Sequence, residues 1–324
     1  MEKEYNWAPV DRLFEIAEKH DKLVLLRFIG GKNRLHSPDW IWKKVTHYVD
    51  GVTPWKANVR TPYLGDPVFQ ELWNGFLREA GKRHGTHPRL QRIAMSSGLD
   101  QEMYYIRPEI FDTAPATSFG GKMSDEKMER LKRFCPKGLD QCVDDLVWSW
   151  HQTFETYKRA FPDKAFVIDL SDPIVGVEGI EAYSVVERIA LDASTVFGPR
   201  LYIEQDGLSD KERSLTAQEA LQKKRQGARS NRSLMLDLEE KHMLGFELML
   251  PPELKNRQNP LAIPPDSLFY EDLRRCIDIG LTYPIRFVEV WIDCLNDPAN
   301  EPHVRYLREQ LEGKIARATA KSRP

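Results

Sequence analysis

The chain has 324 residues, with 47 Lys and Arg against 49 Asp and Glu, so its formal net charge is −2. This balance argues against a protein that binds nucleic acid through a general excess of positive charge. The apolar run at Leu23–Ile29 is broken by Arg27 and is far shorter than the roughly 20 residues that span a bilayer. We therefore expect a soluble protein without a nucleic-acid or membrane partner, built as two ordinary domains or one large α/β barrel.

The predicted elements alternate between helices and strands. A helical pattern at Val10–Ala17 leads into a strand at Leu23–Ile29, and Asp66 followed by Pro67 predicts the start of a helix that ends near Gly81. Further strands are predicted at 90–96, 165–170, 200–204, 243–250 and 286–292, and further helices at 140–160, 179–197, 215–241, 267–279 and 302–317. This alternation is typical of βα units around a parallel sheet.

Two α/β architectures fit this order of elements. An open doubly wound sheet usually carries a glycine-rich phosphate loop after its first strand, whereas Ile29–Lys32 matches neither GxGxxG nor a Walker loop. A barrel is favoured by the alternation in Phe287–Asp293, where Phe, Glu, Trp and Asp occupy every second position and indicate a functional inner face. We therefore expect a TIM (β/α)8-type barrel.

Acidic residues gather where the predicted strands end, which is where barrels build their active sites. Glu247 lies among apolar residues, and burying a carboxylate is costly unless it is paired or used. A bridge from Glu247 to Arg27 is the structural alternative. Glu102 lies in a polar loop beside Tyr104, where either a catalytic or a solvated surface acid fits.

Two facing carboxylates are the equipment of glycoside hydrolysis, because one donates a proton to the leaving oxygen and the other attacks the anomeric carbon or activates water. Sugar rings stack on aromatic side chains, and Trp291 is the best placed of the eight tryptophans. Trp40, Trp42 and Trp55 are weaker candidates.

Two segments resemble the clan A glycoside hydrolases, especially their β-galactosidase-like barrels of family 42 type. EKEYNWAPVDRLFEIAEKHDKLVLLRFIGG is similar to a helix and the strand after it, and PVFQELWNGFLREAGKRHGTHPRLQRIAMSSG to the helix and the fourth strand. The resemblance implies that Glu102 is the acid/base, Glu247 the nucleophile, and Trp291 the tryptophan near the end of strand eight. Gln101 departs from the family's pattern, which usually has Asn before the acid/base.

The resemblance also implies that strands three to eight are visible and that the barrel is incomplete at its N-terminus. A gene product lacking the first two strands, a shortened barrel closed by other segments, and completion by a partner chain all remain open. We expect a single, partial barrel domain over residues 1–324. Met1 is followed by EKEYNW, so no signal peptide is visible, and the localisation is left unassigned.

Two functions remain open: a retaining glycoside hydrolase acting on an oligo- or polysaccharide, and a catalytically inactive sugar-binding or interaction barrel. We expect no cofactor, and no metal site because the eight histidines form neither an HxH nor an HExxH pair. The four cysteines are interpreted as buried or incidental thiols, and the basic run Lys223–Arg232 as a solvated helix face or a helix break. Self-association, the sugar and the linkage are left open. The expected substrate-binding residues are Arg27, Tyr104, Asp169, Asp206, Glu289, Trp291 and Asp293.

Overall fold

The protein is described here from a computed structural model. The structure describes residues 5–30, 37–45, 47–52, 58–99, 111, 123–174, 177–178, 180–210, 215–249 and 270–321. The chain divides into two compact units, one formed by Met1–Ile168 and Asp172–Leu201, the other by Asp169–Ser171 and Tyr202–Pro324.

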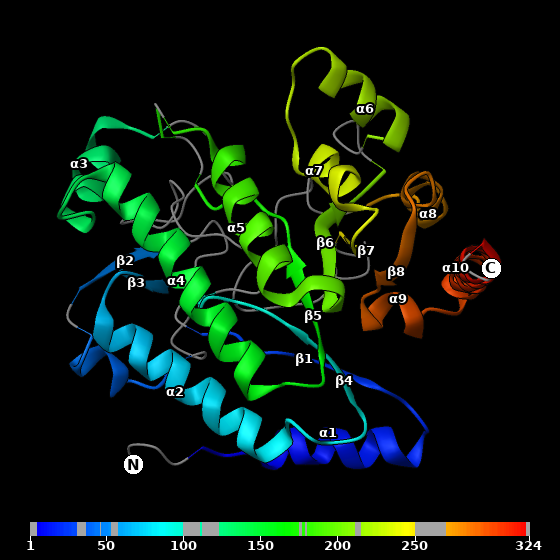
Figure 1. Cartoon of the computed structure of the whole chain (residues 1–324), viewed down its shortest axis with the longest axis horizontal. Helices are drawn as coiled ribbons and strands as arrows, with labels where there is room; N and C mark the ends of the chain where they lie inside the picture. Colours follow the sequence, from blue (N-terminus) through cyan, green and yellow to red (C-terminus); the bar gives the residue numbers. More distant parts are fainter. Residues whose placement is uncertain are drawn as a thin grey trace. The chain divides into compact units, whose positions relative to one another are not determined.

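The first unit combines parallel strands with helices. Its strands run in the order β1 (Val24–Arg27), β4 (Leu90–Ala94) and β5 (Ala165–Asp169), the last of which ends in the second unit. An antiparallel hairpin of β2 (Tyr48–Val52) and β3 (Asn58–Pro62) is separate from them. The helices are α1 (Ala8–Lys19), α2 (Pro67–His84), α3 (Asp125–Phe134), α4 (Leu139–Ala160) and α5 (Ala182–Phe197), and α2, α4 and α5 lie side by side (Figure 1).

Aromatic side chains fill the space between the strands and helices of this unit. Phe197 at the end of α5 contacts Phe154 of α4 and Phe166 of β5, with ring centroids 5.5 and 4.2 Å apart. All three rings are buried. Such large buried rings contribute much of the apolar area that stabilises a core of this size.

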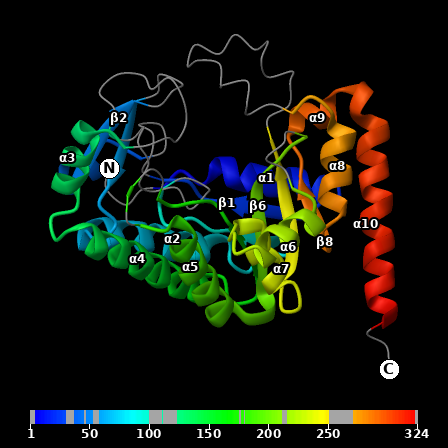
Figure 2. The ribbon, with the colours of Figure 1, turned by 90° about the horizontal axis from the view of Figure 1, so that it is seen from above.

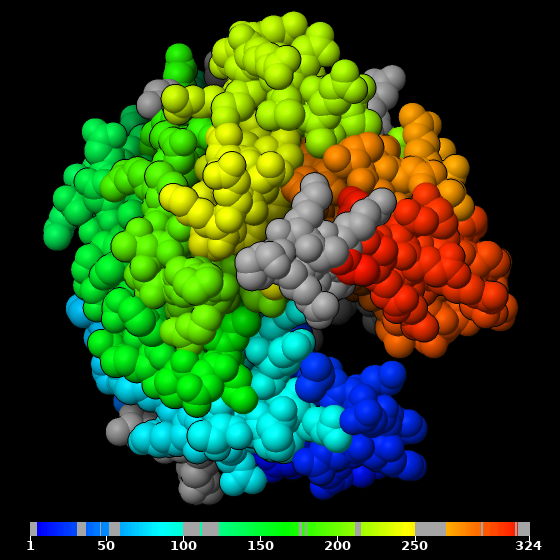
Figure 3. All heavy atoms as spheres, turned by 45° about the vertical axis from the view of Figure 1, so that its right-hand side comes forward, coloured from blue at the N-terminus to red at the C-terminus, as the bar shows by residue number. Residues whose placement is uncertain are grey.

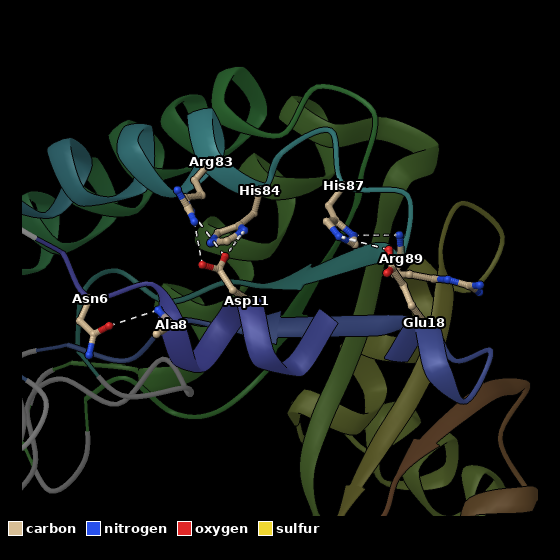
Figure 4. A network of polar contacts seen from close by, with 8 residues as sticks. All are labelled: Asn6, Ala8, Asp11, Glu18, Arg83, His84, His87 and Arg89. Atoms are coloured by element: carbon tan, nitrogen blue, oxygen red, sulfur yellow. Dashed lines mark hydrogen bonds and ion pairs between the residues drawn. The ribbon is translucent and has the colours of Figure 1, made fainter. Parts of the chain in front are cut away.

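Helix α1 is held against the end of α2 by ring contacts and by polar contacts, and Figure 4 shows the polar ones. Phe14 stacks on His87 with centroids 3.9 Å apart, and Asp11 pairs with Arg83 at 2.7 Å. His84 lies buried between the two helices. The N-terminal helix is therefore fixed by a small mixed cluster as well as by apolar burial.

The second unit contains three more parallel strands in the order β6 (Leu201–Leu208), β7 (Met243–Leu248) and β8 (Ile285–Glu289). Its helices are α6 (Ala217–Arg225), α7 (Asn231–Leu238), α8 (Leu273–Leu281), α9 (Ile292–Asn296) and α10 (Glu301–Lys321). The long helix α10 runs beside α8 (Figures 2 and 3). Lys314 of α10 donates to the carbonyl oxygens of Leu281 and Tyr283, at 2.7 and 2.6 Å.

The α/β class predicted from the sequence is confirmed, and so are all six predicted strands. In both units the strands follow one another in chain order, as successive βα units do. Asp66 caps α2 as predicted, since its carboxylate accepts the backbone N–H groups of Val68 and Phe69 at 2.8 and 3.2 Å.

Several predictions of local structure were wrong. The helix expected at 215–241 is two helices, because Gly227 has a positive φ of 90° and Ser230 caps the start of α7. The strand expected at 286–292 ends at Glu289, and α9 begins at Ile292. The hairpin and α3 were not predicted at all.

Two of the four cysteines form a disulfide, which corrects their interpretation as thiols. Cys135 ends α3 and Cys142 lies in the first turn of α4, with Cα atoms 5.5 Å apart. Cys276 and Cys294 are free and buried. Within the described ranges, no helix has both the length and the apolar character that crossing a membrane requires.

Candidate active site

Two glutamates lie side by side at the carboxyl ends of neighbouring strands. Glu247 of β7 is level with Glu289 of β8 in the parallel register, and paired residues of adjacent strands project from the same face of a sheet. Glu247 is the last residue but one of its strand, and Glu289 is the last of its own. The side chain of Glu247 is buried, whereas Glu289 is half-buried. Glu247 therefore lies near the rim of the sheet.

A third glutamate shares this face one level deeper. Glu204 of β6 is level with Gly245, which precedes Glu247 by two residues and so lies on the same side of β7. Glu204 is fully buried, and its backbone carbonyl accepts the N–H of Leu170 at 2.8 Å. We call the set Glu204, Glu247 and Glu289 the carboxylate face.

Asp169 and Asp206 meet through the backbone of β6. The N–H of Asp206 donates to Oδ1 of buried Asp169 at 3.0 Å. Asp206 lies in an irregular stretch of β6, because the register with β7 shifts between Gln205 and Leu208, and Gly207 has a φ of 83°. Asp169 thus holds the irregular end of this strand.

Trp291 follows β8 and is tied to the end of β7. Its indole Nε1–H donates to the carbonyl oxygen of Leu248 at 2.8 Å, and the residue is half-buried. Trp291 is therefore placed just beyond Glu289 but outside the strand itself. Asp293, expected on the same strand, belongs to α9, and its side chain lies outside the described residues.

The other face of these strands packs against helices. Phe246 of β7 contacts the ring of Tyr283 with centroids 5.1 Å apart, and the guanidinium of Arg232 from α7 lies 5.0 Å from the Phe246 ring. Arg232 also donates to the carbonyl of Leu215 at 3.2 Å. One face of the sheet in this unit is therefore apolar and covered, and the other carries the carboxylates.

Three further predicted site residues belong to the first unit or lie outside the described residues. Arg27 ends β1 and belongs to the first unit. Glu102 and Tyr104 lie outside the described residues, so the pairing of Glu102 with Glu247 stays a prediction. Among the residues described, His, Cys, Asp and Glu form no group of three or more that could hold a metal ion.

Glu204 was predicted among the acidic residues at the strand ends, and Leu201 and Ile203 alternate with Tyr202 and Glu204 as in a two-faced strand. The role of Gly245 beside this face was missed. A glycine inside a strand often marks a close approach by another group.

Carboxylates arranged in this way can perform a limited set of reactions. An ionised carboxylate can attack an electrophilic carbon or remove a proton, and it can accept hydrogen bonds from substrate hydroxyl groups. Glu247 is buried at a strand end, so it can reach a substrate at the rim while being shielded from bulk water. Glu289 lies beside it at the same level.

No family model matches the chain, and no curated protein does either. The solved structures that match the chain include three β-galactosidases. The protein from the psychrophilic Marinomonas ef1 has a TM-score of 0.47 and 11% identity, covering 89% of this chain and 47% of that one. The Rahnella sp. R3 protein has a TM-score of 0.30 and 12% identity, covering 80% of this chain and 33% of that one. A catalytic mutant of a GH42 protein from G. stearothermophilus has a TM-score of 0.31 and 12% identity, covering 88% of this chain and 36% of that one. The chain spans less than half the length of each of these proteins.

Proposed function

We propose that the protein is a retaining glycoside hydrolase in which Glu247 is the nucleophile and Glu102 the acid/base. Residues 1–324 form a single, partial (β/α)8-type barrel domain in this proposal. Strands β1, β4, β5, β6, β7 and β8 correspond to strands three to eight of the barrel.

The proposal depends on one observation above all. A buried glutamate lies at the carboxyl end of β7, level with a second glutamate on β8, on a sheet face that bears carboxylates. Barrel enzymes build their active sites from residues at the carboxyl ends of their strands, which is where Glu247 lies. The sequence resemblance assigns the nucleophile to this same residue.

The reaction would proceed in two displacements. The Glu247 carboxylate attacks the anomeric carbon, and the glycosidic bond breaks as Glu102 gives its proton to the departing oxygen. Glu102 then takes a proton from water, which attacks the same carbon and releases the sugar and the Glu247 carboxylate. Glu289 and Asp206 would accept hydrogen bonds from sugar hydroxyls, and Trp291 would offer its ring to the sugar.

The substrate in this proposal is an oligo- or polysaccharide. The similar solved structures are named as β-galactosidases, so β-galactosides are the first compounds to test. No nucleic acid, membrane or cofactor enters the proposal, and self-association stays open.

The test is covalent labelling with activated 2-deoxy-2-fluoro glycosides, followed by mass spectrometry of the digested protein. These reagents form the glycosyl-enzyme quickly and release it slowly, so the label should be found on the peptide that contains Glu247. Glu247→Gln should remove the label and lower aryl glycoside turnover by roughly 10³-fold or more, because the nucleophile is lost.

Glu312→Gln provides a matched control, since Glu312 is exposed on α10 and has no part in the proposal. It should label and turn over substrate like the parent protein. Binding of sugars without label or turnover would favour the inactive sugar-binding barrel, and a label on another carboxylate would overturn the assignment of Glu247.

A further inference from the structure

Phe287 occupies the space that a side chain at residue 245 would fill. Gly245 and Phe287 are level on β7 and β8, and a Cβ added to Gly245 would overlap three atoms of the Phe287 ring. The ring therefore lies against the backbone of β7. It does so on the carboxylate face, directly below Glu247 and Glu289.

The ring also reaches toward β6. Its centroid lies 5.9 Å from that of Tyr202, at an interplanar angle of 59°. Tyr202 precedes Glu204 by two residues and thus shares its face. Phe287 and Tyr202 together form an aromatic contact that spans all three strands, beneath the level of Glu247 and Glu289.

We propose that Phe287 is a positioning residue for the carboxylate of Glu247, an inference that rests on the proposed function. With the ring over Gly245, the side chain of Glu247 has no room to fold down along β7 and is directed toward the rim. Packed interiors hold side chains in few rotamers, and a displacement of about 1 Å at a reacting group can cost roughly 10²-fold in rate.

Three variants of this pair test the proposal. Phe287→Leu keeps an apolar side chain but loses the flat ring, and Gly245→Ala pushes the ring away. Each should slow labelling of Glu247 by about 10-fold or more, while the concentration of reagent at half-maximal rate changes little. The double variant should recover part of the rate, because the smaller leucine leaves room for the new methyl group.

Phe246→Leu is the matched control. It makes the same substitution one residue from Gly245, on the opposite face, where the buried Phe246 ring contacts Tyr283. Its melting temperature should fall, but the folded protein should label at the parent rate. This separates positioning from a general loss of core packing. If Phe287→Leu does not fold, Phe287→Met, which keeps more of the volume, takes its place.

The outcomes separate the two proposals. Labelling of the parent protein at Glu247 with an unchanged rate in folded Phe287→Leu would overturn the role of Phe287 and leave the proposed function intact. An equal loss of rate in Phe246→Leu would also overturn it. Absence of any label on the parent protein would overturn the proposed function, and the role of Phe287 with it.

Discussion

His84 is an imidazole held between two helices in a setting that disfavours its charge. It is only 2% exposed, Trp7 approaches it edge-on with centroids 5.3 Å apart, and Phe14 lies 5.4 Å away. Its Nε2 has no hydrogen-bond partner among the residues described. Burial lowers the pKa of His84, and Arg83 and His87 lower it further, whereas the Asp11 carboxylate raises it.

This pKa shift makes stability depend on pH. Because the folded pKa lies below the unfolded value of about 6.5, the unfolded chain binds more protons as the solution is acidified. The stabilisation is present above pH 6.5 and is lost as the pH falls below it. The Asp11 carboxylate also contributes stability that is lost on acidification, but at lower pH. Its hydrogen bond to Arg83 lowers the Asp11 pKa from its ordinary value near 3.8.

We therefore expect the melting temperature of the parent protein to fall between pH 7 and pH 5, and to fall less in His84→Gln. The comparison is made by thermal unfolding at several pH values. An equal slope in the parent and in His84→Gln would contradict this account.

At the scale of elements, α2 depends on the cap at its start. The Asp66 carboxylate accepts two of the backbone N–H groups that the helix itself cannot satisfy. Asp66→Ala should lower the free energy of unfolding by about 1 kcal/mol, measured by urea denaturation. Asp66→Asn keeps a capping oxygen and should lose only a small part of this. A loss as large in the Asn variant would argue that the cap is not the cause.

The sequence predicted the elements best where local signals agreed with one another. Asp66 and Pro67 specify a helix start in two adjacent residues, and the six strands are runs of β-branched and apolar residues between turn signals. The break between α6 and α7 lies in the basic run Lys223–Arg232, for which a helix break was one of two interpretations. The sequence did not decide between them, because helical residues continue on both sides of Gly227.

Other elements depend on contacts that a single segment does not reveal. The hairpin is held by cross-strand hydrogen bonds and by a bidentate ion pair. Nε and Nη2 of Arg60 donate to the two carboxylate oxygens of Asp50, at 2.7 and 2.9 Å. Helix α3 follows a cap at Ser124, but its packing involves Phe134 against the distant rings of Tyr63 and Phe111. The pairing of two cysteines is likewise a tertiary property.

Part of the candidate site could be predicted from local sequence patterns. Alternation along β8 placed Phe287 and Glu289 on one face, and the apolar neighbours of Glu247 predicted its burial. Strand register was not readable, so the closeness of Glu204 to this face and the fit of Phe287 over Gly245 had to come from the structure. Trp291 and Asp293 were predicted on the last strand, but they lie at the start of α9. The strand was predicted too long because the β-branched residues Val290 and Ile292 follow its end.

At the scale of the whole molecule, basic and acidic residues nearly balance, with 47 against 49. The dense basic run at 223–232 is also partly neutralised, since Lys224 pairs with Asp237, and Arg232 is buried. We expect the protein to pass through a heparin column at pH 7.5 and about 0.1 M salt, where only a substantial basic surface is retained. Retention beyond about 0.3 M salt would contradict the expectation of no nucleic-acid partner.

The disulfide between α3 and α4 links the two parts of the chain on either side of one exposed lysine, in addition to the peptide backbone. Lys137 lies between Cys135 and Cys142, and its side chain is open to solvent. If trypsin cut only after Lys137, it would leave two pieces, 1–137 and 138–324, that migrate as one band on a denaturing gel until a reductant is added. Continuity between the two parts of the chain therefore does not depend on that peptide bond.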